Sequence, residues 1–106
     1  MSGDYTTITD PSAYFHTQLY TGSGSSGLQV RNNANAGDFT PDWLWIKPRS
    51  IADNHVLFDS SRGFNKQLKS NGNDAEDTHS PARITRETNG FDVDTTDQNY
   101  NQSSAT

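Results

Sequence analysis

The chain has 106 residues, a formal net charge of −5 and no cysteine. A chain of this length supports one domain, and its hydrophobic fraction of 29% is low for a protein that must bury its own core. The scattered lysines and arginines argue against nucleic acid and anionic membranes as partners. The lack of cysteine excludes disulfides and thiolate sites. The N-terminus shows no signal-peptide pattern and no apolar run is long enough to span a membrane, so we expect synthesis in the cytosol without an export signal.

The first twenty residues predict an extended arm followed by a short helix. Residues 1–9 are mostly polar, so we expect them to form the arm. Asp10 suits a helix N-cap and Pro11 suits the first helical position, so we expect a helix over 10–20. Phe15 and Leu19 would share one face of it. This helix either plugs one end of the domain or docks on a neighbouring chain, and the sequence leaves both open.

The alternation of apolar and polar residues predicts strands over residues 21–96. After a Gly/Ser-rich loop, Leu28–Val30 alternates as a half-buried strand does. Residues 64–70 favour another strand, although the spacing of their apolar residues also suits a helical turn. The acidic stretch 73–83 predicts a long surface loop that ends at Ile84, a lone apolar anchor. The turn at Asn89-Gly90 then leads into a strand at 91–94.

The centre of the chain, residues 41–63, predicts two apolar strands joined by a polar loop. Trp43–Ile46 places its two tryptophans on one sheet face and Leu44 and Ile46 on the other. Two tryptophans on one face could form a platform for sugar rings, but a strand that is apolar on both faces favours the core. The residues expected in the core are Trp43, Leu44, Trp45, Ile46, Val56, Leu57, Phe58, Phe91 and Val93.

Several of these stretches resemble a known family. PDWLWIKPRS at 41–50, NHVLFDSSRG at 54–63, KQLKSN at 66–71 and NGF at 89–91 are similar to a repeat-like domain of marine bacteriophage structural proteins, especially cyanophage tail-fibre-like proteins. Residues 5–15 also look like the usual start of such proteins. Because that domain is classed with concanavalin A-like lectins, the resemblance implies an all-β, antiparallel jelly-roll-like sandwich with a short N-terminal helix.

The end of the chain lacks a strand that the resemblance implies. In that family an aromatic-rich strand follows a segment like 97–106, so we expect these residues to be a polar tail leading toward a missing strand. The sandwich would then be incomplete in this chain. Either a longer protein continues past Thr106, which we favour, or another chain supplies the strand by pairing with an open sheet edge.

Acidic side chains are the candidate contacts for a cation or a glycan. Asp92, Asp94 and Asp97 could offer carboxylate oxygens to calcium, as in lectin-like sandwiches. However, they lack the glycine and spaced glutamate of a helix–loop–helix calcium site, and outward aspartates are common on edge strands. The stretch 74–79 also carries metal donors, and a solvated acidic loop is the favoured interpretation.

No pattern of catalytic residues stands out. Glycoside hydrolysis needs paired carboxylates, and Glu76 and Glu87 both fall in predicted loops. Ser60, Ser61, Asp59 and His55 crowd at one strand end, where neighbouring side chains point apart, so they do not indicate a triad. We expect His55 to be structural. We therefore expect a protein that is not an enzyme and needs no cofactor or metal.

The resemblance implies a phage virion structural protein, part of a tail fibre or appendage, that acts in particle assembly and host attachment. It would be located in the virion and made in the host cytoplasm. Its partners would be other virion proteins, further copies of itself and a host surface glycan, with no nucleic acid and no membrane. A carbohydrate-binding lectin-like module and a capsid decoration protein are the alternatives.

Overall fold

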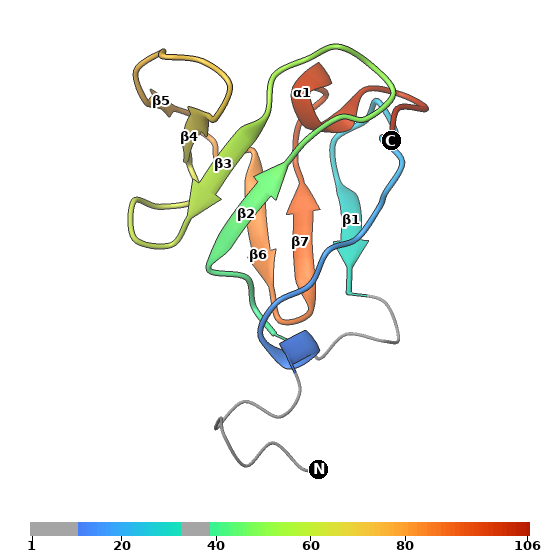
Figure 1. The fold of residues 1–106 in the computed structure, drawn as a ribbon, viewed down its shortest axis with the longest axis vertical. Coiled ribbons are helices and arrows are strands. Elements are labelled where there is room, and N and C mark those ends of the chain that lie inside the picture. The colour runs from blue at the N-terminus through green and yellow to red at the C-terminus, as the bar shows by residue number, and fades with distance from the viewer. Residues whose placement is uncertain (1–10, 33–38) are drawn as a thin grey trace.

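The structure is a computed structural model that describes residues 11–32 and 39–106 (Figure 1). The predicted N-terminal arm and Asp10 lie outside these residues. In the described part, seven strands form two antiparallel sheets. The three-stranded sheet has the order β1 (Leu28–Arg31), β7 (Gly90–Val93) and β6 (Ile84–Glu87). The four-stranded sheet has the order β2 (Trp43–Ile46), β3 (Val56–Asp59), β4 (Lys66–Lys69) and β5 (Asp77–Thr78).

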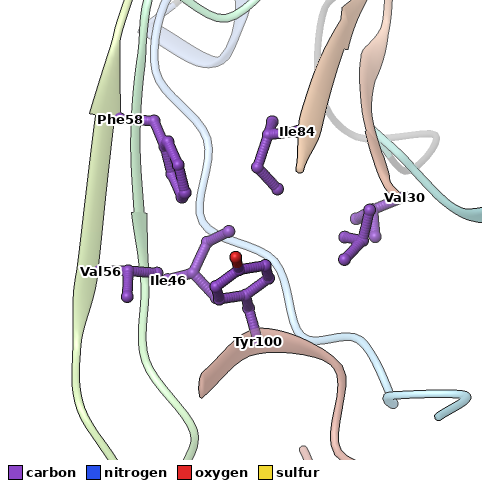
Figure 2. Close-up of a cluster of buried hydrophobic side chains, with 7 residues drawn as sticks. Val30, Ile46, Val56, Phe58, Ile84 and Tyr100 are labelled. Atoms are coloured by element: carbon purple, nitrogen blue, oxygen red, sulfur yellow. The ribbon is translucent and has the colours of Figure 1, made fainter. Parts of the chain in front are cut away.

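The hydrophobic core lies between the two sheets (Figure 2). Each strand turns alternate side chains inward, which is why apolar residues at every second position meet there. The buried hydrophobic cluster comprises Val30, Ile46, Val56, Phe58, Ile84, Val93 and Tyr100. Leu44 and Phe91 are partly buried and pack against it. The predicted all-β sandwich is confirmed.

The helix predicted over 10–20 is wrong for most of its length. Only Pro11–Ala13 forms a single 3-10 turn, η1, and residues 15–20 are not helical. Their burial alternates instead, with Phe15 and Leu19 exposed while Gln18 and Tyr20 are partly buried. Gln18 donates from Nε2 to the carbonyl oxygen of Arg31, and the Tyr20 hydroxyl donates to the carbonyl oxygen of Tyr100. An eleven-residue helix is marginally stable by itself, so the contacts that every second residue makes in the extended segment prevail.

Two short strands are absent from the sequence-based prediction. Asp77–Thr78, inside the predicted loop, pairs with β4 as β5. Ile84, the predicted lone anchor, begins β6, which pairs with β7 along four residues. Ile84 is the buried apolar residue of β6. Backbone hydrogen bonds rather than an apolar pattern therefore define both strands.

The C-terminal segment is part of the domain, so the prediction of a polar tail at 97–106 is wrong. Residues Gln98–Asn101 form a helix, α1, that places Tyr100 in the core (Figure 2). Asn101 is fully buried and joins α1 to the loop before β1, because its Oδ1 accepts from the N–H of Ser23 and its Nδ2 donates to the carbonyl of Ser25. Neither helix of the described residues is long and apolar enough to cross a membrane.

Candidate functional site

The two tryptophans of β2 lie on the outer face of the four-stranded sheet, so their predicted place in the core is wrong. Trp43 is 52% exposed and Trp45 is 55% exposed, whereas Leu44 and Ile46 face the other sheet. Leu57 pairs with Trp45 across β2 and β3 and shares this outer face, which also removes it from the predicted core. The alternation of the strand fixes which residues share a face, but the second sheet covers only one of the two faces.

An apolar row crosses the outer face of three strands. Trp45 lies opposite Leu57, and Leu57 lies opposite Leu68 on β4. The ring centroids of Trp43 and Trp45 are 6.4 Å apart at an interplanar angle of 54°. The Nε1 of Trp45 donates to the Ser70 hydroxyl at 3.2 Å. The two indole rings therefore form a positioned, solvent-facing pair rather than two isolated side chains.

A groove of about 540 Å³ runs beside β2, between this strand and the segment 14–20. Its deep part is lined by core residues of both sheets, including Val30, Ile46 and Phe91. Its rim holds all of the large hydrophobic side chains that are more than half exposed in the described residues. These are Tyr14, Phe15, Leu19, Trp43 and Trp45. The most exposed large hydrophobic side chains of the described chain are thus gathered at one place.

Strand β2 is an edge strand whose outer backbone groups are open. The N–H of Ser60 donates to the carbonyl oxygen of Asp42, so the ladder to β3 continues through Leu44 and Ile46. In an antiparallel ladder the alternate residues, here Trp43 and Trp45, direct their N–H and C=O groups away from the partner strand. No described residue makes a backbone hydrogen bond to these outer groups. The site therefore combines open hydrogen-bonding groups with apolar side chains.

The two ends of β2 carry opposite charges. Asp42 precedes the strand, and its carboxylate accepts from Nη2 of Arg86 at 2.6 Å while remaining largely exposed. Lys47 and Arg49 follow the strand, and neither side chain forms an ion pair with a described residue. The strand is therefore acidic at its start and basic beyond its end.

The three aspartates considered for calcium or glycan contact do not converge. Asp92 pairs with Arg31 at 2.7 Å, and the Thr85 hydroxyl donates to Asp94 at 2.6 Å. Asp97 pairs with Arg83 at 2.7 Å and caps α1 by accepting from the N–H of Asn99. Each carboxylate has a different structural partner, because the strand turns Asp92 and Asp94 outward while Asp97 begins a helix. The described residues contain no cluster of three or more potential metal ligands.

The acidic stretch 74–79 is held by basic side chains. Glu76 accepts from Nη1 of Arg62 at 3.0 Å and from Nζ of Lys66 at 3.4 Å. Asp74 pairs with Lys69 at 3.0 Å. The hydrogen bond from Lys69 to Asp74 raises the pKa of Lys69, and the Arg62 guanidinium lowers the pKa of Glu76. This charge pairing gives the stretch a structural role beside β4.

The residues considered for a catalytic triad serve other contacts. Asp59 accepts from the backbone N–H of Arg62 at 2.8 Å and from its Nε at 2.6 Å. The first of these bonds is the largest contribution to the lowered pKa of Asp59. The ring of His55 lies 6.4 Å from that of Trp45, on the outer face of the sheet. Asp59 therefore fixes the turn after β3 and His55 borders the tryptophan pair.

A family model described as "Domain of unknown function (DUF7483)" matches residues 10–106. The chain belongs to this family. No curated protein and no solved structure matches the chain. The family match covers both sheets, α1 and every residue of the groove, so the groove is part of the DUF7483 domain itself.

Sequence reasoning found the tryptophans of this site but missed its other wall. Tyr14, Phe15 and Leu19 were expected on a helix, where Phe15 and Leu19 would share a buried or docking face. The structure brings them to the groove on an extended segment. The available signal was the absence of an apolar residue at positions 16–18, which leaves a helix with only a narrow apolar stripe.

Proposed function

We propose that this chain is a structural protein of a bacteriophage particle, part of a tail fibre or appendage, that acts by assembling with other virion proteins. The observation that carries the proposal is the apolar groove beside the open edge of β2. The sequence resemblance of residues 41–71 supplies the biological setting. The jelly-roll, concanavalin A-like class of the sandwich belongs to the same proposal.

The groove favours a binding role because exposure of its apolar side chains to water is unfavourable. Apolar surface contributes roughly 25 cal/mol for each Å² removed from water. Small soluble domains rarely gather large apolar side chains in one patch unless another molecule covers it. Here such side chains line both walls of the groove, and the open backbone groups of Trp43 and Trp45 lie between them. A protein partner can satisfy both kinds of surface at once.

Quantitative mass spectrometry of purified phage particles tests the assembly role. We expect the chain in washed particles at a fixed copy number relative to the other structural proteins. The double variant Trp43→Ser/Trp45→Ser should lower its copy number in particles while its level in the infected cell stays unchanged. A matched double variant, Gln29→Ser/Thr85→Ser, changes exposed residues of the other sheet and should assemble normally. Absence of the wild-type chain from washed particles would refute the proposal.

A glycan-binding role is the second candidate, and the solvent-facing pair Trp43 and Trp45 favours it. Aromatic faces stack on sugar rings, and a tilted pair can contact two adjacent rings. The chain has no other tryptophan, so intrinsic fluorescence reports on this pair alone. Titration with host surface polysaccharide should quench or shift the emission saturably if the candidate is right. An unchanged emission at saturating polysaccharide would leave assembly as the only role of the pair.

A further inference from the structure

We propose that the open edge of β2 pairs with β2 of a second copy of this chain, antiparallel and about a two-fold axis at Leu44. The inference rests on the proposed assembly role and names its first partner. The pairing would join two four-stranded sheets into one continuous sheet across the edge that Figure 1 shows without a neighbouring strand.

The backbone of β2 is self-complementary in this arrangement. Trp43 and Trp45 each direct one N–H and one C=O outward, as the ladder to β3 requires. A two-fold axis at Leu44 sets Trp43 of one copy opposite Trp45 of the second copy. The two residues then exchange both hydrogen bonds, and the symmetry repeats the exchange on the other side of the axis. All of these outer groups find a partner.

The side chains support the same register. Trp43 and Trp45 share the outer face, so the pairing places four indole rings side by side across the joined sheets. Aromatic pairs directly opposite each other on neighbouring strands stabilise a sheet. Phe15 and Leu19 are exposed and form the other wall of the groove beside β2. In the proposed pair, these side chains of both copies would lie near the joined β2 strands.

The charges at the ends of β2 select an antiparallel second copy. Antiparallel pairing brings the acidic start of one strand, at Asp42, beside the basic end of the other, at Lys47 and Arg49. A parallel arrangement would place like charges together. Lys47 and Arg49 have no ion pair within the described residues, so they are available for this contact.

Strand β2 also lacks the features that keep natural edge strands apart. Residues 43–46 contain no proline and no charged residue. An edge strand of the other sheet, β1, differs because the carbonyl oxygen of its Arg31 accepts a hydrogen bond from the Gln18 side chain. Within the described residues, the outer backbone groups of Trp43 and Trp45 on β2 have no such partner.

Hydrogen exchange at two concentrations tests the inference on the full wild-type chain. The amides of Leu44 and Ile46 face β3 and should be protected at both concentrations. The amides of Trp43 and Trp45 should exchange fast when dilute and slow at high concentration, in step with a doubling of the mass by light scattering. Fast exchange at Trp43 and Trp45 together with a monomer mass at high concentration would overturn the inference.

Two lysine variants sharpen the result. Trp45→Lys places a charge in the pairing edge and should weaken self-association at least about tenfold, which equals about 1.4 kcal/mol. Gln29→Lys adds the same charge at an exposed position on β1 and should leave self-association unchanged. Equal behaviour of the two variants would refute pairing through β2. A chain that stays monomeric yet is found in particles at a fixed copy number refutes the second copy as partner while the assembly role stands.

Discussion

The ring of Tyr100 meets the ring of Phe58 edge-on, with centroids 5.9 Å apart at an interplanar angle of 87°. This contact joins α1, near the end of the described chain, to β3 at the centre of the four-stranded sheet. The Tyr100 hydroxyl lies 3.3 Å from Nη1 of Arg83 and its carbonyl oxygen accepts from the Tyr20 hydroxyl at 2.6 Å. Tyr100 therefore connects the core and the segment before β6 through its side chain, and the N-terminal segment through its backbone carbonyl.

Replacement of Tyr100 by alanine should strongly destabilise the domain. The substitution removes a buried ring that contacts Phe58 and leaves the Arg83 guanidinium with one partner fewer. Loss of a buried aromatic ring lowers the free energy of unfolding by about 3 to 5 kcal/mol. Urea unfolding measures the change. The control Tyr14→Ala removes an exposed ring and should change the free energy of unfolding by less than about 0.5 kcal/mol. Equal losses in both variants would show that α1 does not complete the core.

Gly90→Ala should break the three-stranded sheet. Gly90 has φ of +152° and pairs with Arg31, and a Cβ there would collide with the carbonyl oxygen of Val30. We expect loss of the β1 and β7 pairing and a fall of about 3 kcal/mol or more in the free energy of unfolding. Circular dichroism during urea unfolding measures it. Gly72→Ala is the control, because a Cβ at Gly72 meets only ordinary contacts. A Gly90→Ala variant as stable as Gly72→Ala would contradict this backbone geometry.

The alternation of apolar residues predicted five of the strands but not which face of β2 would be covered. Trp43 and Leu44 are both large and apolar, so periodicity places them on opposite faces without showing which face is buried. The second sheet decides this, because it packs only on the Leu44 side. Local sequence contains no information on that long-range packing, which is why an apolar pattern on both faces of β2 predicts a core position for Trp43 and Trp45.

The C-terminal helix was missed for a related reason. Tyr100 is the only large apolar residue in a polar stretch, so no periodic pattern marks the segment. Its structure comes from polar contacts instead, with Asp97 as the cap and Asn101 buried against the backbone of Ser23 and Ser25. An aspartate before a polar stretch suits a cation ligand as well as a helix N-cap, and the structure shows that the Asp97 carboxylate is the cap of α1.

The ion pairs of Arg62 should make stability depend on pH in the acid range. Hydrogen bonds from the backbone and guanidinium of Arg62 hold the pKa of Asp59 below its ordinary 3.8, and the guanidinium holds that of Glu76 below 4.5. A carboxyl group with a lowered pKa in the folded state adds stability above its unfolded pKa and loses it as the pH falls through the folded value. The stabilisation is therefore complete above about pH 5 and declines below it.

Arg62→Met should remove part of this decline. We expect a smaller loss in the free energy of unfolding between pH 7 and pH 3 than in the wild type, measured by urea unfolding at each pH. The control Arg49→Met removes an exposed arginine that forms no ion pair with the described residues and should keep the wild-type slope. An unchanged slope in Arg62→Met would mean that the Arg62 guanidinium lowers the pKa of neither Asp59 nor Glu76 in the folded chain, because the backbone N–H of residue 62 is still present in this variant.

Arg86 should hold the two sheets together at the end of the sandwich near β2. It belongs to β6 in one sheet, yet its Nε donates to the carbonyl oxygen of Pro41 at 2.7 Å, just before β2 in the other. Its guanidinium carbon also lies 5.3 Å from the ring centroid of Phe64. Because Asp42 is largely exposed, its ion pair with Arg86 adds little, and the Pro41 and Phe64 contacts carry most of the stabilisation.

Arg86→Met and Arg86→Lys separate these contributions. Methionine keeps the packed stem and loses the charge, so we expect a fall of about 1 to 2 kcal/mol in the free energy of unfolding. Lysine keeps the charge near Phe64 but cannot donate from Nε to Pro41, so it should restore only part of the loss. Urea unfolding of both variants, beside Arg49→Met as a surface control, measures this order. Full restoration by lysine would show that charge alone, rather than the planar guanidinium, bridges the sheets and positions the start of the β2 edge.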